Sequence, residues 1–350
     1  MKPRVYLDWN ASAPLRPEAR EAVVAALDAT GNPSSVHAEG RRARGIVERA
    51  RGQVAELAGC KPSEVVFTSG ATEAASVLRH AGTVAVEETA HDCLWAHHDL
   101  TPGPGSATLA MGLGNSETGV VTVPQAEGPW RFGDTSCGWL FLDVTQAVGR
   151  IPWSFAWSGA TFACLSSHKI GGPRGVGALI IREGTDIAAI QKGGGQELGR
   201  RSGTENVAGI AGFGAAAAAA LAELNAGVWD RVAELRNILE KALASGARET
   251  IFVGKESVRL PNTSCIVTPG WKGETQVMAM DLAGFAVSSG SACSSGKVKV
   301  PRVLRAMGLD DRSAEAALRV SLGPATTEDE VTAFAEAWLT AEQKFRRRAA

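Results

Sequence analysis

Three reactive side chains follow apolar runs of strand character. Thr72 comes shortly after "EVVFTSG", Asp143 ends "WLFLD", and Lys169 follows "TFACLSSH". In open α/β sheets ligands bind at the carboxyl ends of strands, so we expect these side chains at one edge of a sheet. Each residue alone also has an ordinary explanation: Thr72 as a helix N-cap, Asp143 in a cap or ion pair, and Lys169 as an exposed lysine in a turn.

Together, the three groups match the chemistry of one cofactor. The turn Ser69-Gly70-Ala71 opens a helix at Thr72, and free backbone N–H groups with a hydroxyl favour a phosphate. A carboxylate such as Asp143 can pair with a protonated ring nitrogen, and a desolvated lysine forms Schiff bases. A phosphate, a pyridine nitrogen and an aldehyde are the three groups by which proteins bind pyridoxal 5'-phosphate (PLP). The sequence therefore predicts a PLP site.

A fourth reactive group, the thiol of Cys293, lies in "SSGSACSSG", a stretch of small and polar residues. Buried thiols normally pack among apolar neighbours, and this one has none beside it in the chain. We therefore predict that Cys293 is an accessible nucleophile. The other five cysteines are Cys60, Cys93, Cys137, Cys164 and Cys265. No two cysteines form a C-x-x-C pair, which argues against a metal site built by local spacing, and we expect no metal.

Composition excludes several classes of protein. The 350 residues carry a formal net charge of -1, so no basic field indicates nucleic acid binding. The N-terminus lacks the apolar core of a signal peptide, so we expect a cytoplasmic protein with reduced thiols. The Ala-rich run 207–222 is typical of a core helix rather than a membrane span.

Hydrophobic patterning predicts an α/β fold with two domains. Strands and helices alternate from about residue 40 to 225, as in a mainly parallel sheet covered by helices, and shorter elements of a smaller α+β domain follow. We expect a large domain at 13–225 and a small domain formed by 1–12 with 226–350. The predicted elements include strands at 139–144 and 161–167, and helices at 206–224, 228–245, 276–282 and 328–345.

The chain resembles the cysteine desulfurases, in the class V, fold-type I group of PLP enzymes, almost end to end. The blocks that carry this resemblance are "YLDWNASAPLRP", "GNPSSVHAEGRRAR", "VVFTSGATE", "NSETGVV", "DVTQAVGR", "SSHKIGGPRGVGAL", "GGGQELGRRSGTENV", "SSGSACSSGKV" and "LRVSLGP". The resemblance implies a large domain with a sheet of the seven-stranded type between helices, and a small C-terminal domain that carries Cys293.

The resemblance also implies a role for each matching residue. The residues implied in cofactor binding are Lys169, Asp143, Gln146, Thr72, Ala71, Ser166, His168, Thr204 and Ser116. Of these, Asp143 would pair with the ring nitrogen and Gln146 would bond the phenolic oxygen. Thr204 would reach the phosphate in the neighbouring subunit, which implies a homodimer.

The substrate and catalytic residues follow from the same resemblance. Arg319 would clamp the substrate carboxylate, and Asn115 is a further candidate for substrate binding. Lys169 would take the α-proton of L-cysteine, and His91 would stack on the ring and help to move protons. Cys293 would attack the substrate sulfur and become a persulfide, leaving alanine. An acceptor protein, for example in iron–sulfur cluster assembly, would then collect the sulfur.

The sequence departs from the family pattern in several places. The family has two asparagines before Glu-Thr-Gly, and the second contacts the cofactor. This chain has Asn115-Ser116 instead. The contact with the cofactor would therefore be lost, bridged by water or made by Asn115. The segment 121–143 is short for a crossover of helix and strand, and the C-terminus ends soon after its last helix. The alternatives are a selenocysteine lyase or other PLP β-eliminating enzyme, and a weakly active sulfur-relay or scaffold paralogue.

Overall fold

The computed structural model describes residues 4–99, 107–247, 249–290 and 302–349. The chain divides into two compact units. The large unit comprises residues 13–114 and 122–226, and the small unit comprises 1–12, 115–121 and 227–350. Residues 115–121 therefore belong to the small unit, although the sequence analysis places them in the large domain.

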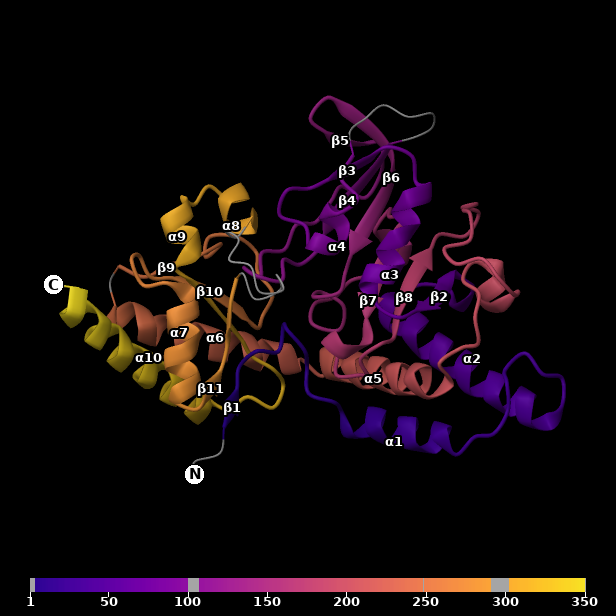
Figure 1. Cartoon of the computed structure of the whole chain (residues 1–350), viewed down its shortest axis with the longest axis horizontal. Helices are drawn as coiled ribbons and strands as arrows, with labels where there is room; N and C mark the ends of the chain where they lie inside the picture. Colours follow the sequence, from indigo (N-terminus) through magenta and orange to yellow (C-terminus); the bar gives the residue numbers. More distant parts are fainter. Residues whose placement is uncertain (1–3, 100–106, 248, 291–301, 350) are drawn as a thin grey trace. The chain divides into compact units, whose positions relative to one another are not determined.

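A seven-stranded sheet forms the centre of the large unit (Figure 1). Its strands are β2 (Val65–Thr68), β3 (Val84–Val86), β4 (Ala107–Gly112), β5 (Trp130–Phe132), β6 (Thr135–Asp143), β7 (Phe162–Ser166) and β8 (Gly177–Ile181). They lie in the order β2-β8-β7-β6-β4-β3, with β5 paired to β6. Strands β3, β4, β6 and β7 run parallel, and β8 runs antiparallel to both of its neighbours. The predicted α/β class with a mainly parallel sheet is confirmed.

Helices of the large unit differ widely in length. They are α1 (Pro17–Leu27), α2 (Ala38–Ala58), α3 (Ala71–Ala75), α4 (Asp92–Trp95) and α5 (Val207–Asn225), with 3-10 turns η1 (Pro62–Glu64), η2 (Ser76–His80), η3 (Phe155–Trp157), η4 (Ser167–Lys169) and η5 (Gln196–Gly199). Helix α5 contacts both α1 and α2. It is the one helix of the described chain that is long and apolar enough to cross a membrane, yet Ile210 and Phe213 on it are buried in the unit.

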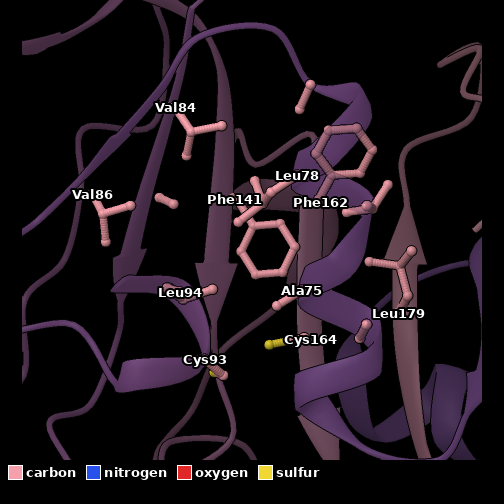
Figure 2. Packing of buried hydrophobic residues seen from close by; sticks show 14 of the residues in the cluster. Ala75, Leu78, Val84, Val86, Cys93, Leu94, Phe141, Phe162, Cys164 and Leu179 are labelled. Atoms are coloured by element: carbon pink, nitrogen blue, oxygen red, sulfur yellow. The ribbon is translucent and has the colours of Figure 1, made fainter. Parts of the chain in front are cut away.

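An apolar cluster lies where α3, η2 and α4 meet the sheet (Figure 2). Phe141 on β6 and Phe162 on β7 are fully buried within it, beside Leu78 of η2. Cys93 and Cys164 belong to the same cluster, and burial raises the pKa of both thiols. The cluster therefore holds the ends of β6 and β7, the strands that carry Asp143 and lead to Lys169.

The connection between the parallel strands β4 and β6 contains no helix. Residues 113–134, all of which the structure describes, form loops and the short strand β5, which pairs antiparallel with β6. A cavity of about 240 Å³ lies beside this connection, between Leu113, Val123, Trp153 and Trp157. The segment 121–143 is short because it forms the β5–β6 hairpin, where a crossover helix was expected.

The described residues of the small unit form two sheets and five helices. Its strands are β1 (Val5–Tyr6), β9 (Ile251–Phe252), β10 (Thr263–Val267), β11 (Phe285–Ala286), β12 (Ser288–Ser289) and β13 (Ala317–Ser321); its helices are α6 (Val228–Gly246), α7 (Gly273–Leu282), α8 (Arg302–Ala306), α9 (Asp311–Glu315) and α10 (Glu328–Ala349). Strands β12, β13, β10 and β9 form an antiparallel sheet, and β1 pairs with β11 in parallel. Helix α10 begins with a capping box, because Thr327 N donates to Glu330 Oε2 at 2.9 Å and Glu330 N donates to Thr327 Oγ1 at 3.3 Å.

Candidate active site

The first predicted element of the site is the turn between β2 and α3. The turn approaches β8 so closely that a Cβ added to Gly177 would lie 2.7 Å from the Cα of Gly70. Ser166, at the end of β7, is buried beside the same turn, with its Oγ 3.7 Å from the Cβ position of Gly70. Ala71 and Thr72 follow in the first turn of α3, and Thr72 is exposed. The structure thus brings the predicted phosphate-binding residues Ala71, Thr72 and Ser166 to one place.

Asp143 ends β6 and is buried in the large unit. Its Oδ1 accepts a hydrogen bond from the backbone N–H of Thr145 at 2.9 Å, and its Oδ2 lies 3.9 Å from the thiol of Cys93. The thiol is a weak donor, so the hydrogen bond from Thr145 is the stronger of these two. A buried carboxylate of this kind is suited to pair with a cationic ring nitrogen.

His91 caps the short helix α4 next to Asp143. Its Nδ1 accepts a hydrogen bond from the backbone N–H of Cys93 at 3.1 Å, so this nitrogen carries no proton. The ligand atoms of His91, Cys93 and Asp143 all lie within 4.8 Å of one another. The structure therefore brings His91 and Asp143 together, as the resemblance implies, and adds Cys93, which sequence reasoning missed.

Lys169 and Gln146 are joined by a residue that the sequence analysis did not single out. Arg150 is buried, and its Nη1 donates to Gln146 Oε1 at 2.7 Å while its Nη2 donates to the carbonyl oxygen of Lys169 at 3.1 Å. The signal in the sequence was the position of Arg150, four residues after Gln146 in "DVTQAVGR". Arg150 fixes the acceptor oxygen of Gln146 and thereby directs its amide nitrogen, the donor needed for a phenolic oxygen.

His168 precedes Lys169 in the turn η4 and is half-buried. Burial, with contributions from the nearby charges of Lys169 and Arg174, lowers the pKa of His168 to about 4. The imidazole is therefore neutral at pH 7 and is available as a neutral hydrogen-bond donor.

Thr204 lies in the segment between η5 and α5 and is exposed. The segment is tied to the sheet by Glu197, whose carboxylate accepts two hydrogen bonds from Arg51 at 2.8 and 2.9 Å and one from Phe67 N at 2.9 Å. Glu197 and Leu198 both have positive φ angles, 49° and 59°. Thr204 is therefore exposed on an anchored segment, as the predicted contact with a neighbouring subunit requires.

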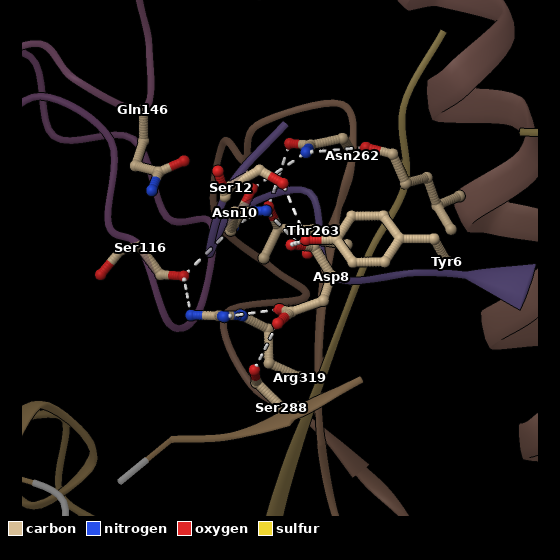
Figure 3. Close-up of polar contacts among 12 residues, drawn as sticks. Tyr6, Asp8, Asn10, Ser12, Ser116, Gln146, Asn262, Thr263, Ser288 and Arg319 are labelled. Atoms are coloured by element: carbon tan, nitrogen blue, oxygen red, sulfur yellow. Dashed lines mark hydrogen bonds and ion pairs between the residues drawn. The ribbon is translucent and has the colours of Figure 1, made fainter. Parts of the chain in front are cut away.

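Arg319 and Ser116 lie together in the small unit (Figure 3). Arg319 Nη1 donates to the carbonyl oxygen of Ser116 at 3.1 Å, and Arg319 Nη2 bonds Asp8 Oδ1 at 2.8 Å. The side-chain oxygen of Asn115 accepts from the backbone N–H groups of Glu117 and Thr118, both at 2.9 Å. Asn115 Oδ1 therefore closes the local turn. Cys293 lies outside the described residues.

The functional groups that the large unit brings to this edge of the sheet suit the binding of PLP. Asp143 supplies a buried carboxylate, Lys169 an amine, and the turn at Gly70 offers N–H groups and hydroxyls beside a strand that only glycine can approach so closely. All of them lie at or just beyond the carboxyl ends of β2, β6 and β7, the edge at which α/β sheets bind ligands.

Comparison with known proteins identifies the family. The model of the aminotransferase class-V family matches residues 5–91 and 106–334, so the chain belongs to this family. A cysteine desulfurase of Frankia sp. (strain EuIK1) is 39% identical, over 95% of this chain and 90% of the relative. A cysteine desulfurase of Cereibacter sphaeroides is 36% identical, over 95% and 94% of the two chains. The crystal structure of a NifS-like protein from Rickettsia africae superposes with a TM-score of 0.85 at 28% identity, covering 97% of this chain and 99% of the other.

Proposed function

We propose that this protein is a PLP-dependent cysteine desulfurase that converts L-cysteine to L-alanine and carries the sulfur as a persulfide on Cys293. The observation that supports this most strongly is the placement of His91 beside Asp143 at the end of β6, with Lys169 in the turn after the neighbouring strand β7, in a chain whose relatives are cysteine desulfurases.

Within one subunit, the cofactor would be held mainly by groups of the large unit. Lys169 would bind the aldehyde carbon through Nζ, Asp143 would pair with the ring nitrogen, and the turn before Thr72 would hold the phosphate with Ser166 and His168. PLP at this site would supply an electron sink for charge that develops at the substrate α-carbon. Gln146, fixed by Arg150, would donate to the phenolic oxygen.

Proton transfer would fall to Lys169 and His91. The amine of Lys169 would remove the α-proton of L-cysteine, since lysine can act as a general base when its amine is neutral. His91 has Nδ1 fixed as an acceptor, so its Nε2 is the nitrogen that carries the proton in the neutral ring. Arg319 would bind the carboxylate of the substrate through its remaining N–H groups.

Sulfur transfer would be the work of Cys293. Its thiolate would attack the substrate sulfur, so that an S–S bond forms and the C–S bond breaks. The electron pair of the broken bond would stay with the three-carbon fragment, which takes up protons and leaves as alanine. The persulfide would then pass to an acceptor protein in the cytoplasm, in a pathway such as iron–sulfur cluster assembly.

We also propose a homodimer in which Thr204 reaches the site of the neighbouring subunit. The anchored segment 193–206 and the exposure of Thr204 support this assignment. Size measurement in solution with a Thr204→Val variant tests it: wild-type and variant should both be dimers, and the variant should bind PLP more weakly.

Titration of the protein with PLP, followed by L-cysteine, tests the proposed function. We expect visible absorbance from a PLP–lysine adduct that a Lys169→Ala variant lacks, and stoichiometric release of alanine and sulfide when a thiol reductant is present. Release of sulfide from L-cysteine at the wild-type rate by a Cys293→Ala variant would indicate a selenocysteine lyase or another β-eliminating enzyme. Failure to bind PLP would indicate the sulfur-relay or scaffold role.

A further inference from the structure

The path of the N-terminal segment places Asp8 beside Arg319. Strand β1 leads into a stretch that runs along β13, where Ser321 N donates to the carbonyl oxygen of Leu7 at 2.9 Å and Trp9 N donates to the carbonyl oxygen of Ser321 at 3.2 Å. Arg319 and Ser321 are two residues apart on a strand, so their side chains point to the same face. The pairing register thus brings the carboxylate of Asp8 to the guanidinium of Arg319 (Figure 3).

Asp8 and Arg319 are both largely withdrawn from solvent. The side chains are 15% and 6% exposed, and Arg319 Nη2 lies 2.8 Å from Asp8 Oδ1. The second oxygen of Asp8, Oδ2, accepts a hydrogen bond from Ser288 Oγ at 2.8 Å. Asp8 is therefore held from one side by Ser288 and holds Arg319 on the other.

Arg319 is held at its second nitrogen by a rigid main-chain group. Nη1 donates to the carbonyl oxygen of Ser116, which also accepts from Asn10 Nδ2 at 3.2 Å. Asn10 belongs to a buried network in which Asn262 Nδ2 donates to Asn10 Oδ1 at 3.0 Å and Asn10 Nδ2 donates to Thr263 Oγ1 at 2.9 Å. Buried and satisfied networks of this kind are rigid, so the carbonyl of Ser116 is a fixed acceptor.

One donor of Arg319 has no acceptor among the described residues. Nε is buried without a hydrogen-bond partner, although a guanidinium carries five N–H groups. Burying a charged donor without an acceptor costs free energy, so a group of this kind indicates that a ligand supplies the acceptor. An anionic group that accepts from Nε would complete the set of contacts around Arg319.

We propose that Asp8 is a positioning residue for substrate binding: together with the carbonyl of Ser116, it fixes the guanidinium of Arg319 so that Nε–H faces the carboxylate of an amino-acid substrate. The proposal rests on the proposed function for the identity of that substrate. Asp8 contributes by holding a flexible side chain in the binding geometry before the substrate arrives. Ser288 supports it by fixing the orientation of the Asp8 carboxylate.

The test is an Asp8→Asn variant of the PLP-loaded protein, because asparagine keeps the size of the side chain and removes its charge. The matched control is Asp281→Asn, which breaks the exposed ion pair between Arg4 and Asp281 in the same unit. Binding of L-alanine and of ethylamine, which lacks the carboxylate, is followed through the absorbance of the cofactor. We expect the Asp8→Asn variant to bind L-alanine about tenfold more weakly and ethylamine equally well, because a guanidinium that is no longer held in place weakens only the ligand that has a carboxylate.

Two further measurements complete the test. The KM for L-cysteine should rise about tenfold in Asp8→Asn with kcat within about twofold, and Asp8→Glu should recover part of the loss. Equal weakening of L-alanine and ethylamine would show a merely structural role. Unchanged L-alanine binding would show that Asp8 has no role in substrate binding. Tighter binding would show that Asp8 competes with the substrate for Arg319. Either result overturns the proposal.

The two claims fail separately. A wild-type protein that desulfurates L-cysteine, with no selective loss of L-alanine binding in Asp8→Asn, contradicts the role of Asp8 alone. A wild-type protein that does not desulfurate L-cysteine, but whose Asp8→Asn variant loses L-alanine selectively, contradicts the proposed reaction and leaves the role of Asp8 standing. Wild-type protein that binds neither compound overturns both.

Discussion

The guanidinium of Arg51 makes a bidentate ion pair with the carboxylate of Glu197, with N–O distances of 2.8 and 2.9 Å. The two residues lie 146 positions apart in the chain, one on helix α2 and the other in the turn η5. Glu197 Oε2 also accepts from the backbone N–H of Phe67 on β2. This pair therefore ties the segment that carries Thr204 to both a helix and a strand of the large unit.

Arg51→Ala should lower the free energy of unfolding by about 3 kcal/mol, because it leaves the buried carboxylate of Glu197 without its charged partner. Urea unfolding followed by circular dichroism measures the change. The control is Lys61→Ala, which breaks the exposed ion pair between Lys61 and Glu183 and should cause no measurable loss. Equal effects of the two substitutions would contradict the assignment.

Arg150→Met should weaken PLP binding about tenfold, because Gln146 and the carbonyl of Lys169 both lose the donor that orients them. Absorbance titration with PLP measures the affinity. Arg182→Met is a matched control, since Arg182 also donates to main-chain carbonyls, those of Ala160 and Phe155. The control should lose stability but retain its PLP affinity, and a wild-type affinity in Arg150→Met would refute this role.

Stability of the PLP-free protein should fall between pH 6.5 and pH 4 through His168. The folded-state pKa of about 4 lies below the ordinary value of 6.5, so the unfolded chain binds a proton across this window and the folded protein does not. The loss is on the order of 2 kcal/mol after allowance for partial exposure. His168→Gln should flatten this part of the stability profile, whereas substitution of the exposed His80 should leave it unchanged. An unaltered profile in His168→Gln would count against the assignment.

Thr327→Ala should destabilise the small unit by about 1 kcal/mol, because the N–H of Glu330 loses its acceptor at the start of α10. Thermal unfolding measures the shift. Thr340→Ala serves as the comparison, since Thr340 lies inside the same helix and bonds only the carbonyl of Glu336. A larger loss from Thr340→Ala would contradict the role of the capping box.

Local patterns in the sequence were sufficient to predict the long helices of the C-terminal half and some of the strands. The helix expected at 206–224 is found at Val207–Asn225, with Asn206 as its cap, and the helix expected at 228–245 is found at Val228–Gly246. Both run for about five turns with apolar positions at helical spacing, which is a strong local signal. The strand expected at 139–144 is longer than predicted, Thr135–Asp143, because its first residues pair with β5 in a hairpin.

The contacts that orient the candidate site could not be predicted in the same way. Asp8 meets Arg319 across 311 positions, and Arg51 meets Glu197 across 146. Such pairs depend on strand register and on the packing of distant segments, which leave no periodic pattern in either partner. Arg150 is the exception: its bond to Gln146 spans four residues of one turn, and a search for polar pairs at that short spacing would have found it.

The assignment of residues 115–121 to the large domain failed for a related physical reason. This segment follows β4 directly in the chain, so its place in the sequence indicates the large unit. Its backbone instead bonds the small unit, where Leu260 N donates to the carbonyl oxygen of Gly119 at 2.7 Å and Val121 N donates to that of Val258 at 2.9 Å. These hydrogen bonds join segments far apart in sequence, and no local propensity encodes them.

Intact-protein mass spectrometry after a single incubation of the PLP-loaded protein with L-cysteine tests the central claim most directly. We predict a mass gain of one sulfur atom, mapped by peptide digestion to Cys293, with one equivalent of alanine released. The Cys293→Ala variant should show no such gain, and Cys93→Ala should retain it. Alanine release without sulfur on Cys293, or sulfur on another cysteine, would contradict the account.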